Sequence, residues 1–309
     1  MRTVRPTVLA RWLRLRPGST CRWSQMRSSE GGAKGTSPVR QQRSAMSSAG
    51  AVVEDEGIPQ HSIKEAFRDI VTSRVSARRF SNRDIDVKTL HEIMSLTQSA
   101  PSSFNVQPWS VVLVRDPDAR ERLSTAMLGA NSKKVLAAPV TAVFCSDLEP
   151  SKRLHRMAQL SRKAGMTETD IAKVSMAVNL FTGEGLVGNV LRNAATSIAS
   201  PMQPAPEVSA AEAWSFKNTA LASQTYILAC TAHGLATAAM EGFDARRVRA
   251  ALDIPDRYSI PMVVCTGYPT EDDKEKGSGG SVKRWRYPAE EVVFDGAFGV
   301  GMKGIDPVF

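Results

Sequence analysis

Residues 210–234 read AAEAWSFKNTALASQTYILACTAHG, a run rich in alanine that is apolar on nearly every side. A helix of this composition has to be buried, either in a core or against a partner chain, because it offers no polar face to water. Gly234 predicts where this helix ends. Any fold of this chain must therefore place the segment in its interior or at an interface.

Helical and strand-like patterns alternate irregularly through the rest of the chain. Apolar periodicity predicts helices at residues 62–72, 87–98 and 117–127, and an irregular helical stretch at 150–195. Short β-branched runs predict strands at residues 109–115, 140–145 and 258–267. The pattern has no regular βαβ rhythm, so we expect one α+β domain over residues 60–309.

The basic charge of the chain is confined to its first 50 residues. The formal net charge is +9, and residues 1–50 hold ten basic side chains and one acidic one, which leaves the remainder neutral. A neutral remainder argues against a large nucleic-acid surface. The Arg- and Ser-rich start has the composition of an organelle transit peptide. We expect residues 1–50 to be a mitochondrial transit peptide and disordered linker, and the protein to be mitochondrial.

The four cysteines form no Cys-x-x-Cys pair, and Cys145, Cys230 and Cys265 lie in apolar runs. Buried free thiols are therefore expected, and neither a zinc site nor a disulfide framework is predicted. The sequence also lacks a long uncharged apolar run, so no membrane span is predicted.

Residues 183–188 read GEGLVG and match the glycine pattern of dinucleotide-binding loops. That fingerprint requires a preceding strand, whereas the residues before this one have a helical pattern. We interpret the segment as a turn between two helices.

Two pairs of arginines, far apart in the sequence, suit a common anion. Arg74, Ser76 and Arg78 are spaced two apart, so their side chains point the same way if the segment is extended. Arg284 and Arg286 repeat this spacing after the glycine-rich loop at 271–281. Guanidinium groups match the oxygens of a phosphate in forked geometry, which favours a phosphate ligand.

Residues 100–109, APSSFNVQPW, form a polar loop between a predicted helix and a predicted strand. Trp109 and the two prolines are expected to fix the turn into the strand. The loop's own residues leave open whether its polar side chains, among them Ser102, Ser103 and Asn105, bind a ligand.

Four segments together resemble the FMN-dependent nitroreductase family: RVSAR, APSSFNVQPW, GLATAAMEGFD and RWRYP. They occur in the family's order over residues 60–290. The presequence and the length are also similar to the mitochondrial type I nitroreductases of trypanosomatids. The resemblance implies a mostly antiparallel or mixed sheet flanked by helices, in an intertwined homodimer with two FMN sites at its interface.

The resemblance also assigns the binding residues. It implies that the FMN phosphate is held by Arg74, Ser76, Arg284 and Arg286. It places Arg78 at the N1–C2=O edge of the flavin, where a fixed cation stabilises the charge left by reduction. It implies contacts to the partner subunit's FMN from Ser102, Ser103 and Asn105. It assigns the polar edge and N5 of the ring to Asn131, Lys134, Glu241 and Gly242.

The implied activity is a ping-pong hydride transfer through flavin N5, from NADH or NADPH to a nitroaromatic or a quinone. The cofactor supplies the chemistry, so we assign no catalytic side chain and no metal ligand. Three alternatives stay open: a reductive dehalogenase or specialised quinone reductase of the same fold, a mitochondrial nucleic-acid-binding protein, and a flavin-binding scaffold without turnover. Residues 150–215 carry no motif that fixes the substrate. Within them, Phe181 is a candidate for stacking on a ligand, whereas Trp214 is expected in the core.

Overall fold

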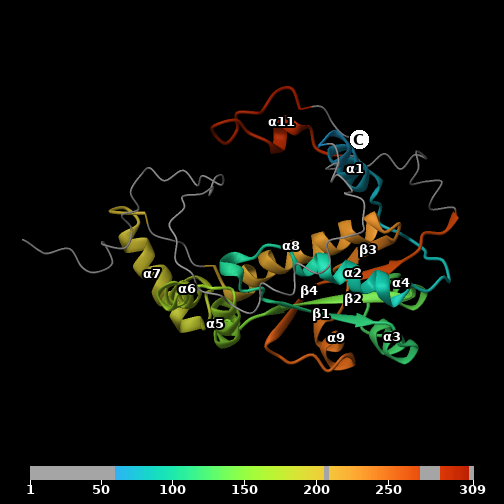
Figure 1. Ribbon diagram of the computed structural model, residues 1–309, viewed down its shortest axis with the longest axis horizontal. Helices are drawn as coiled ribbons and strands as arrows, with labels where there is room; N and C mark the ends of the chain where they lie inside the picture. The colour runs from blue at the N-terminus through green and yellow to red at the C-terminus, as the bar shows by residue number, and fades with distance from the viewer. Residues whose placement is uncertain (1–59, 205–208, 272–285, 306–309) are drawn as a thin grey trace, which may run out of the picture. The chain divides into compact units, whose positions relative to one another are not determined.

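The computed structural model describes residues 60–204, 209–271 and 286–305. The centre of this part is an antiparallel sheet with the strand order β1–β2–β4–β3 (Figure 1). Its strands are β1 (Trp109–Val114), β2 (Val140–Asp147), β3 (Ala236–Met240) and β4 (Tyr258–Gly267). The expected α+β class and the three expected strands are confirmed. The predicted transit peptide and linker, and Arg284, lie outside the described residues.

Helices cover both faces of the sheet (Figure 1). The helices of the described part are α1 (Gln60–Ser73), α2 (Val87–Gln98), α3 (Pro117–Ser124), α4 (Asn131–Ala137), α5 (Leu154–Lys163), α6 (Glu168–Phe181), α7 (Leu186–Ala199), α8 (Ala211–Ala232), α9 (Ala245–Ala251) and α11 (Ala289–Val292). Short 3-10 turns are η3 (Ser103–Asn105) and η4 (Pro150–Arg153). None of the helices in the described ranges is long and apolar enough to cross a membrane.

Alternating side chains of β2 build two cores, one on each face of the sheet. Ala142 and Phe144 pack with residues of α2 and α8, whereas Val143 and Cys145 pack with residues of α3, α4 and α9. Every residue of β2 is buried because this strand is central and covered on both faces. A strand buried on both faces reads as a continuous apolar run, which is why residues 140–145 were recognisable.

The alanine-rich helix α8 is the buried helix that the sequence predicts. The Tyr226 ring packs edge-on against Phe144, with ring centroids 5.6 Å apart, and its hydroxyl lies 2.8 Å from Thr266 Oγ1. The helix ends at Ala232, and Gly234, two residues later, has a φ of 70°. The Leu235 N–H donates to the Cys230 carbonyl and the Gly234 N–H to that of Thr231, which closes a Schellman motif.

The cysteines of the described part are buried free thiols, as expected. Burial raises the pKa of Cys145 and Cys230 to about 12 and that of Cys265 to about 11. These thiols therefore stay protonated at neutral pH and serve as small apolar core residues.

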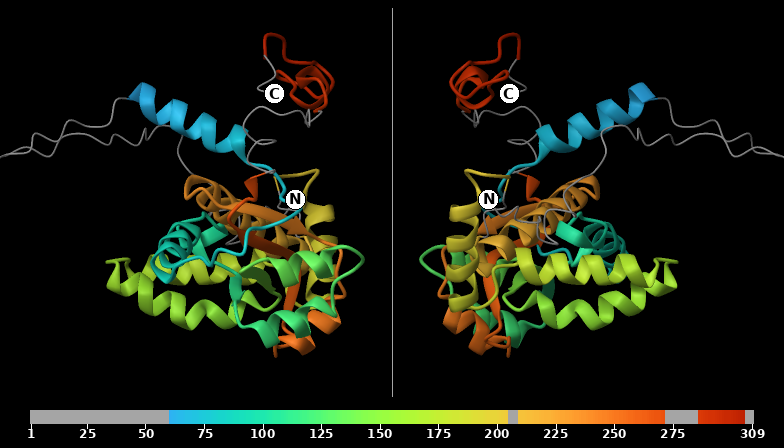
Figure 2. Two further views of the ribbon diagram at one scale, coloured as in Figure 1. Left: turned by 90° about the vertical axis from the view of Figure 1, so that its right-hand side faces the viewer. Right: turned by 90° about the vertical axis from the view of Figure 1, so that its left-hand side faces the viewer.

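Helices α5 and α6 lie side by side and form, with η4 and α7, a helical segment over residues 150–199 that we call the lid (Figure 2). The GEGLVG segment joins α6 to α7, so its interpretation as a turn between helices is confirmed. The Glu184 carboxylate accepts hydrogen bonds from both the N–H and the hydroxyl of Ser151, each 2.6 Å long. This carboxylate holds the middle of the lid against its first turn.

Gly183 is required at its position in the lid for two reasons. Its φ of +67° lies in the left-handed region, and a Cβ there would stand 1.9 Å from the Ser209 carbonyl oxygen. Gly165 has a φ of +85° but open space around it.

We expect Gly183→Ala to lower the free energy of unfolding by about 3 kcal/mol or more, because overpacking adds to backbone strain. Gly165→Ala is the matched control and should cost only about 1–2 kcal/mol, since it carries the strain without the clash. Thermal unfolding of the two variants beside the wild type measures both effects. Equal losses would contradict the close approach of Ser209.

Candidate functional site

The segment after α1 is extended at Ser76, which is the condition under which Arg74, Ser76 and Arg78 point the same way. Ser76 forms an isolated parallel bridge with Thr237 of β3, and the Ala77 N–H donates to the Thr237 carbonyl over 2.8 Å. Ala77 is buried while Ser76 and Arg78 are exposed. The chain therefore adds to the outer edge of β3 with Ser76 and Arg78 on its open side.

Arg286 lies close enough to Arg74 to affect the pKa of the Arg74 guanidinium. The half-buried Arg74 guanidinium has a lowered pKa, first because burial disfavours its charge and second because the Arg286 charge repels it. The structure thus brings together two of the arginines that the sequence assigns to one anion. Two guanidinium groups that destabilise each other form a site that an anion would stabilise.

A second group of predicted residues gathers at the other end of β3. The Asn131 Nδ2 donates to the Gly242 carbonyl over 3.2 Å, and the Lys134 ammonium donates to Asn131 Oδ1 over 3.3 Å. A Cβ on Gly242 would stand 2.8 Å from Asn131 Nδ2, so a larger residue would have to displace the Asn131 side chain. Among the described residues, the Gly242 N–H has no hydrogen-bond acceptor.

Strand β3 connects the two groups. Thr237, near its start, pairs with Ser76, and the exposed Glu241 follows its last residue. Four positions of extended chain span roughly 13 Å. The site is therefore elongated along one sheet edge, with cations at one end and with Asn131, Lys134 and an open N–H at the other.

The loop at residues 102–107 has a strained backbone. Phe104, Asn105 and Gln107 have φ values of 56°, 54° and 50°. Non-glycine residues rarely adopt this conformation, and it persists only where neighbouring contacts enforce it. Ser102 Oγ accepts from the Gln107 N–H over 2.9 Å, and the Gln107 side-chain amide donates to Asn105 Oδ1 over 3.0 Å. Trp109, at the end of the loop, is buried as expected.

This loop lies at the sheet corner opposite the arginines. Trp109 of β1 is level with Ser259 of β4, whereas Thr237 of β3 is level with Thr266. The seven positions between Ser259 and Thr266 amount to roughly 23 Å along the strands, and β1 and β3 are three strand spacings apart, roughly 14 Å. Within one chain, Ser102, Ser103 and Asn105 are therefore separated from the arginine group.

Two residues that support the loop were not predicted. The Asn218 side-chain carbonyl accepts from the Ser103 N–H over 2.8 Å, and Arg153 of η4 donates to the Gln107 and Trp109 carbonyls. A polar residue on the buried side of an alanine-rich helix, as Asn218 is, was the available signal. Arg153 had no comparable signal among the other basic residues of the lid.

Phe181 and Trp214, the two aromatic residues considered for stacking on a ligand, lie in different environments. Trp214 is buried in a small core with Val106 and Val178, which confirms its expected structural role. Phe181, the last residue of α6, lies with its ring centroid 5.8 Å from that of Phe104, whose side chain is exposed. These two rings form an aromatic surface beside the strained loop.

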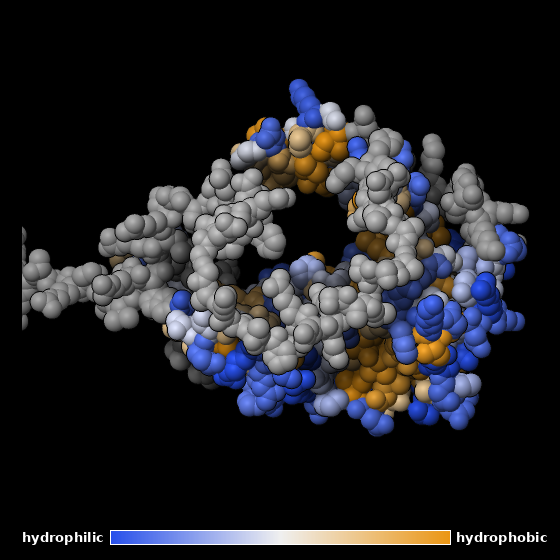
Figure 3. Space-filling model, in the orientation of Figure 1, coloured by the Kyte–Doolittle hydropathy of each residue, from blue (hydrophilic) through white to orange (hydrophobic). Residues whose placement is uncertain are grey.

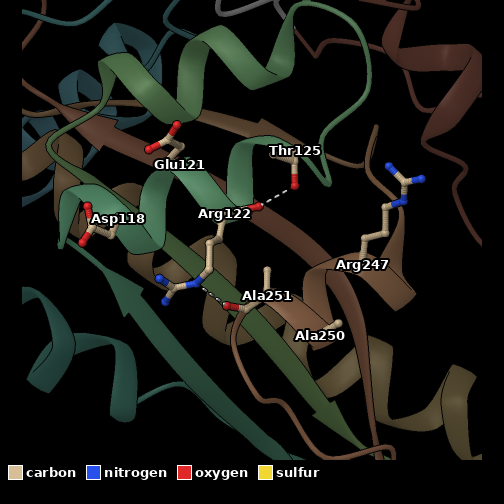
Figure 4. Close-up of a pocket in the computed structure, with 7 residues that line it drawn as sticks. All are labelled: Asp118, Glu121, Arg122, Thr125, Arg247, Ala250 and Ala251. Carbon is tan, nitrogen blue, oxygen red and sulfur yellow. Dashed lines mark hydrogen bonds between the residues drawn. The ribbon is translucent and has the colours of Figure 1, made fainter.

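A hollow of about 600 Å³ lies between α3 and α9, and none of its lining residues is one that the sequence assigns to the site (Figure 4). Arg122, Arg247, Asp118 and Glu121 line it together with three smaller residues. The Arg122 side chain donates to the Ala251 carbonyl across its floor. The mixture of both charges and the lack of a buried donor set give this hollow no evident ligand.

The family model described as "Nitroreductase family" matches residues 71–268 of this chain. A protein of Thermus thermophilus named "NADH dehydrogenase" is 30% identical over 199 residues, which cover 64% of this chain and 84% of that protein.

Two solved structures share the fold. The nitroreductase family protein of Streptococcus pneumoniae TIGR4 superposes with a TM-score of 0.57 at 22% identity, over 74% of this chain and 99% of that one. A structure from Exiguobacterium sibiricum 255-15, described as a nitroreductase in complex with FMN, gives a TM-score of 0.56 at 18% identity, over 74% and 95%. Identities this low support the fold alone.

The arginine group makes a testable prediction about anions. Inorganic phosphate should raise the Tm of the full chain more than sodium chloride of equal ionic strength does, because it binds only the folded state. Arg74→Ala should weaken phosphate binding roughly 10- to 100-fold, since each charge-assisted hydrogen bond contributes about 1.5–3 kcal/mol. The exposed Arg247 of α9 gives the control variant Arg247→Ala. The site assignment is wrong if both variants respond to phosphate as the wild type does.

Proposed function

The chain belongs to the nitroreductase family and is an NAD(P)H-dependent flavin oxidoreductase, and from this premise we propose that it works as a homodimer that reduces nitroaromatics or quinones. FMN is its cofactor, and NADH or NADPH is the electron donor. The enzyme class removes the nucleic-acid-binding and scaffold alternatives from further consideration.

The observation that carries the assignment of the phosphate site is the proximity of Arg286 to Arg74. Burial first, and the Arg286 charge second, lower the Arg74 pKa, and an anion between the two guanidinium groups would favour the charged form, so the donor set fits the phosphate of FMN. The Ser76 side chain, exposed on the same extended segment, adds a hydroxyl donor. We assign these three residues, with Arg284, to the phosphate.

The other end of the site fits a polar heteroaromatic ring edge. Asn131 and Lys134 are held together by their hydrogen bond, and the Gly242 N–H is available to an acceptor. When bound, FMN supplies hydride and electron transfer between the nicotinamide and the final acceptor. We assign Glu241 with Gly242 to N5 of the ring and Arg78 to the edge that gains negative charge, where its fixed cation opposes that charge.

The position of the 102–107 loop supports the homodimer. Ser102, Ser103 and Asn105 are further from the arginine group than one FMN spans, so we assign them to the cofactor of the partner subunit. Apolar side chains on α1 and on residues 286–305 are available for that contact (Figure 3). Ile63, Phe67 and Phe298 are 50%, 59% and 93% exposed in the single chain.

The aromatic rings at the lid and the 102–107 loop support the proposed class of electron acceptor. Phe104 and Phe181 present aromatic surface beside the loop, which suits a planar aromatic acceptor by ring stacking. Quinones and nitroaromatics both meet this description. A reductive dehalogenase would need polar groups that grip one halogenated substrate, and the described part of the lid offers no group that we assign to such a task.

The test begins with the colour of the purified full chain, which should be yellow with one FMN per subunit. NADH or NADPH under anaerobic conditions should bleach it, and a quinone or a nitroaromatic should restore the flavin spectrum. Recolouring by a halogenated phenol with halide release, and by neither of the other acceptors, would favour the dehalogenase. A protein that binds no added FMN would overturn the cofactor assignment.

The phosphate assignment is tested by Arg74→Ala combined with Arg286→Ala. Loss of two charge-assisted contacts of about 1.5–3 kcal/mol each should raise the Kd for FMN by at least roughly 100-fold while the circular dichroism spectrum stays unchanged. Fluorescence titration with FMN measures the Kd, and Arg247→Ala is again the control. Stoichiometric FMN in the purified double variant would show that the phosphate lies elsewhere.

We also propose that the enzyme is mitochondrial, on the basis of the arginine-rich composition of residues 1–50. These residues fused to a fluorescent protein should direct it to mitochondria, whereas a version with its arginines changed to glutamine should stay in the cytosol. A diffuse signal from the unaltered fusion would refute the targeting role.

A further inference from the structure

The strained loop at residues 102–107 requires support from outside itself. Its three positive φ values at Phe104, Asn105 and Gln107 each disfavour the observed conformation, so contacts with neighbouring elements must hold it. Asn218 provides one such contact through the Ser103 N–H. A second one reaches the loop from the first turn of the lid.

That second contact is the guanidinium of Arg153. Its Nη1 donates to the Gln107 carbonyl over 3.0 Å, at the last strained residue. Its Nη2 lies 3.2 Å from both the Trp109 carbonyl and Ser110 Oγ. One planar group therefore holds the end of the loop and the start of β1 together, which a forked donor does better than a single ammonium.

The Arg153 guanidinium is itself held by the carboxylate of Asp147, at the end of β2. Its Nε donates to Asp147 Oδ2 over 2.6 Å, and the Asp147 side chain is completely buried. Arg257 donates to the same oxygen over 2.7 Å but makes no contact with the loop in the described part of the chain. The Glu184–Ser151 contacts fix the backbone of η4, two residues before Arg153.

We propose that Arg153 is a positioning residue for cofactor binding: its guanidinium, oriented by Asp147, keeps the 102–107 loop in the conformation that meets the partner subunit's FMN. This inference rests on the proposed function, because that proposal assigns Ser102, Ser103 and Asn105 to FMN. Arg153 acts through the loop and touches neither cofactor nor substrate.

Arg257 makes a matched control possible, since both arginines share one oxygen of Asp147. Arg153→Met and Arg257→Met each leave the buried carboxylate with one arginine, so both should lower the Tm of the holoenzyme to a similar extent. Arg153→Met should raise the Kd for FMN by roughly tenfold or more, whereas Arg257→Met should change it less than about threefold. Arg153→Lys keeps the charge beside Asp147 but not the fork, so it should recover the Tm without recovering FMN affinity.

The measurements are fluorescence titration with FMN, thermal unfolding and sedimentation velocity at saturating FMN, all on the full chain. The inference is overturned if Arg153→Met and Arg257→Met raise the Kd equally, or if Arg153→Lys restores the wild-type Kd. Should Arg153→Met not fold, Arg153→Lys against Arg257→Lys decides the question. A wild-type chain that binds no FMN would instead refute the proposed function.

Discussion

The packing of α8 against the sheet is the interaction on which the rest of the structure depends. The helix is apolar enough to fill one core, yet buried hydroxyls fix its position. Thr219 accepts from Ser146 over 2.7 Å, and Tyr226 pairs with Thr266. A buried polar group left without a partner costs about 1–3 kcal/mol. These pairs therefore favour one position of the helix on the sheet over shifted positions that would leave the hydroxyls unpaired. Asn218 connects the same helix to the 102–107 loop by accepting from the Ser103 N–H.

Much of the fold was predictable because its central elements have strong patterns. Strands β1, β2 and β4 are β-branched and apolar, and the expected span of α8 is correct to within two residues at each end. Strand β3 was missed because its sequence, ATAAM, has little strand propensity, and it is extended through pairing with β4 on one side. Helices α4 and α9 are only seven residues long, too short for periodicity to reveal.

The candidate site likewise combines features that the sequence predicts with features that it does not. The spacing of Arg74, Ser76 and Arg78 puts their side chains on one side only if the segment is extended, and the structure shows that Ser76 pairs with the edge of β3 and that Arg286 lies near Arg74. The positive φ values of the loop were not predictable, because bulky residues such as Phe104 oppose that conformation when considered alone. Contacts from Asn218 and Arg153 help to hold it beside the hydrogen bonds within the loop, and a single sequence without its fold does not reveal such distant partners.

The turn at Gly234 has a consequence for how this chain tolerates change. Three residues, 233–235, connect α8 to β3, and the Schellman hydrogen bonds fix their path. Successive side chains of a strand point to opposite faces, so one residue inserted or removed here would invert β3 and carry Thr237 and Glu241 to the wrong side. The length of this connection therefore sets which face of β3 each residue occupies in the proposed site, although none of the three residues is assigned to a ligand. Added length in the lid, at residues 150–199, would leave this register intact because the lid lies outside the connection between α8 and β3.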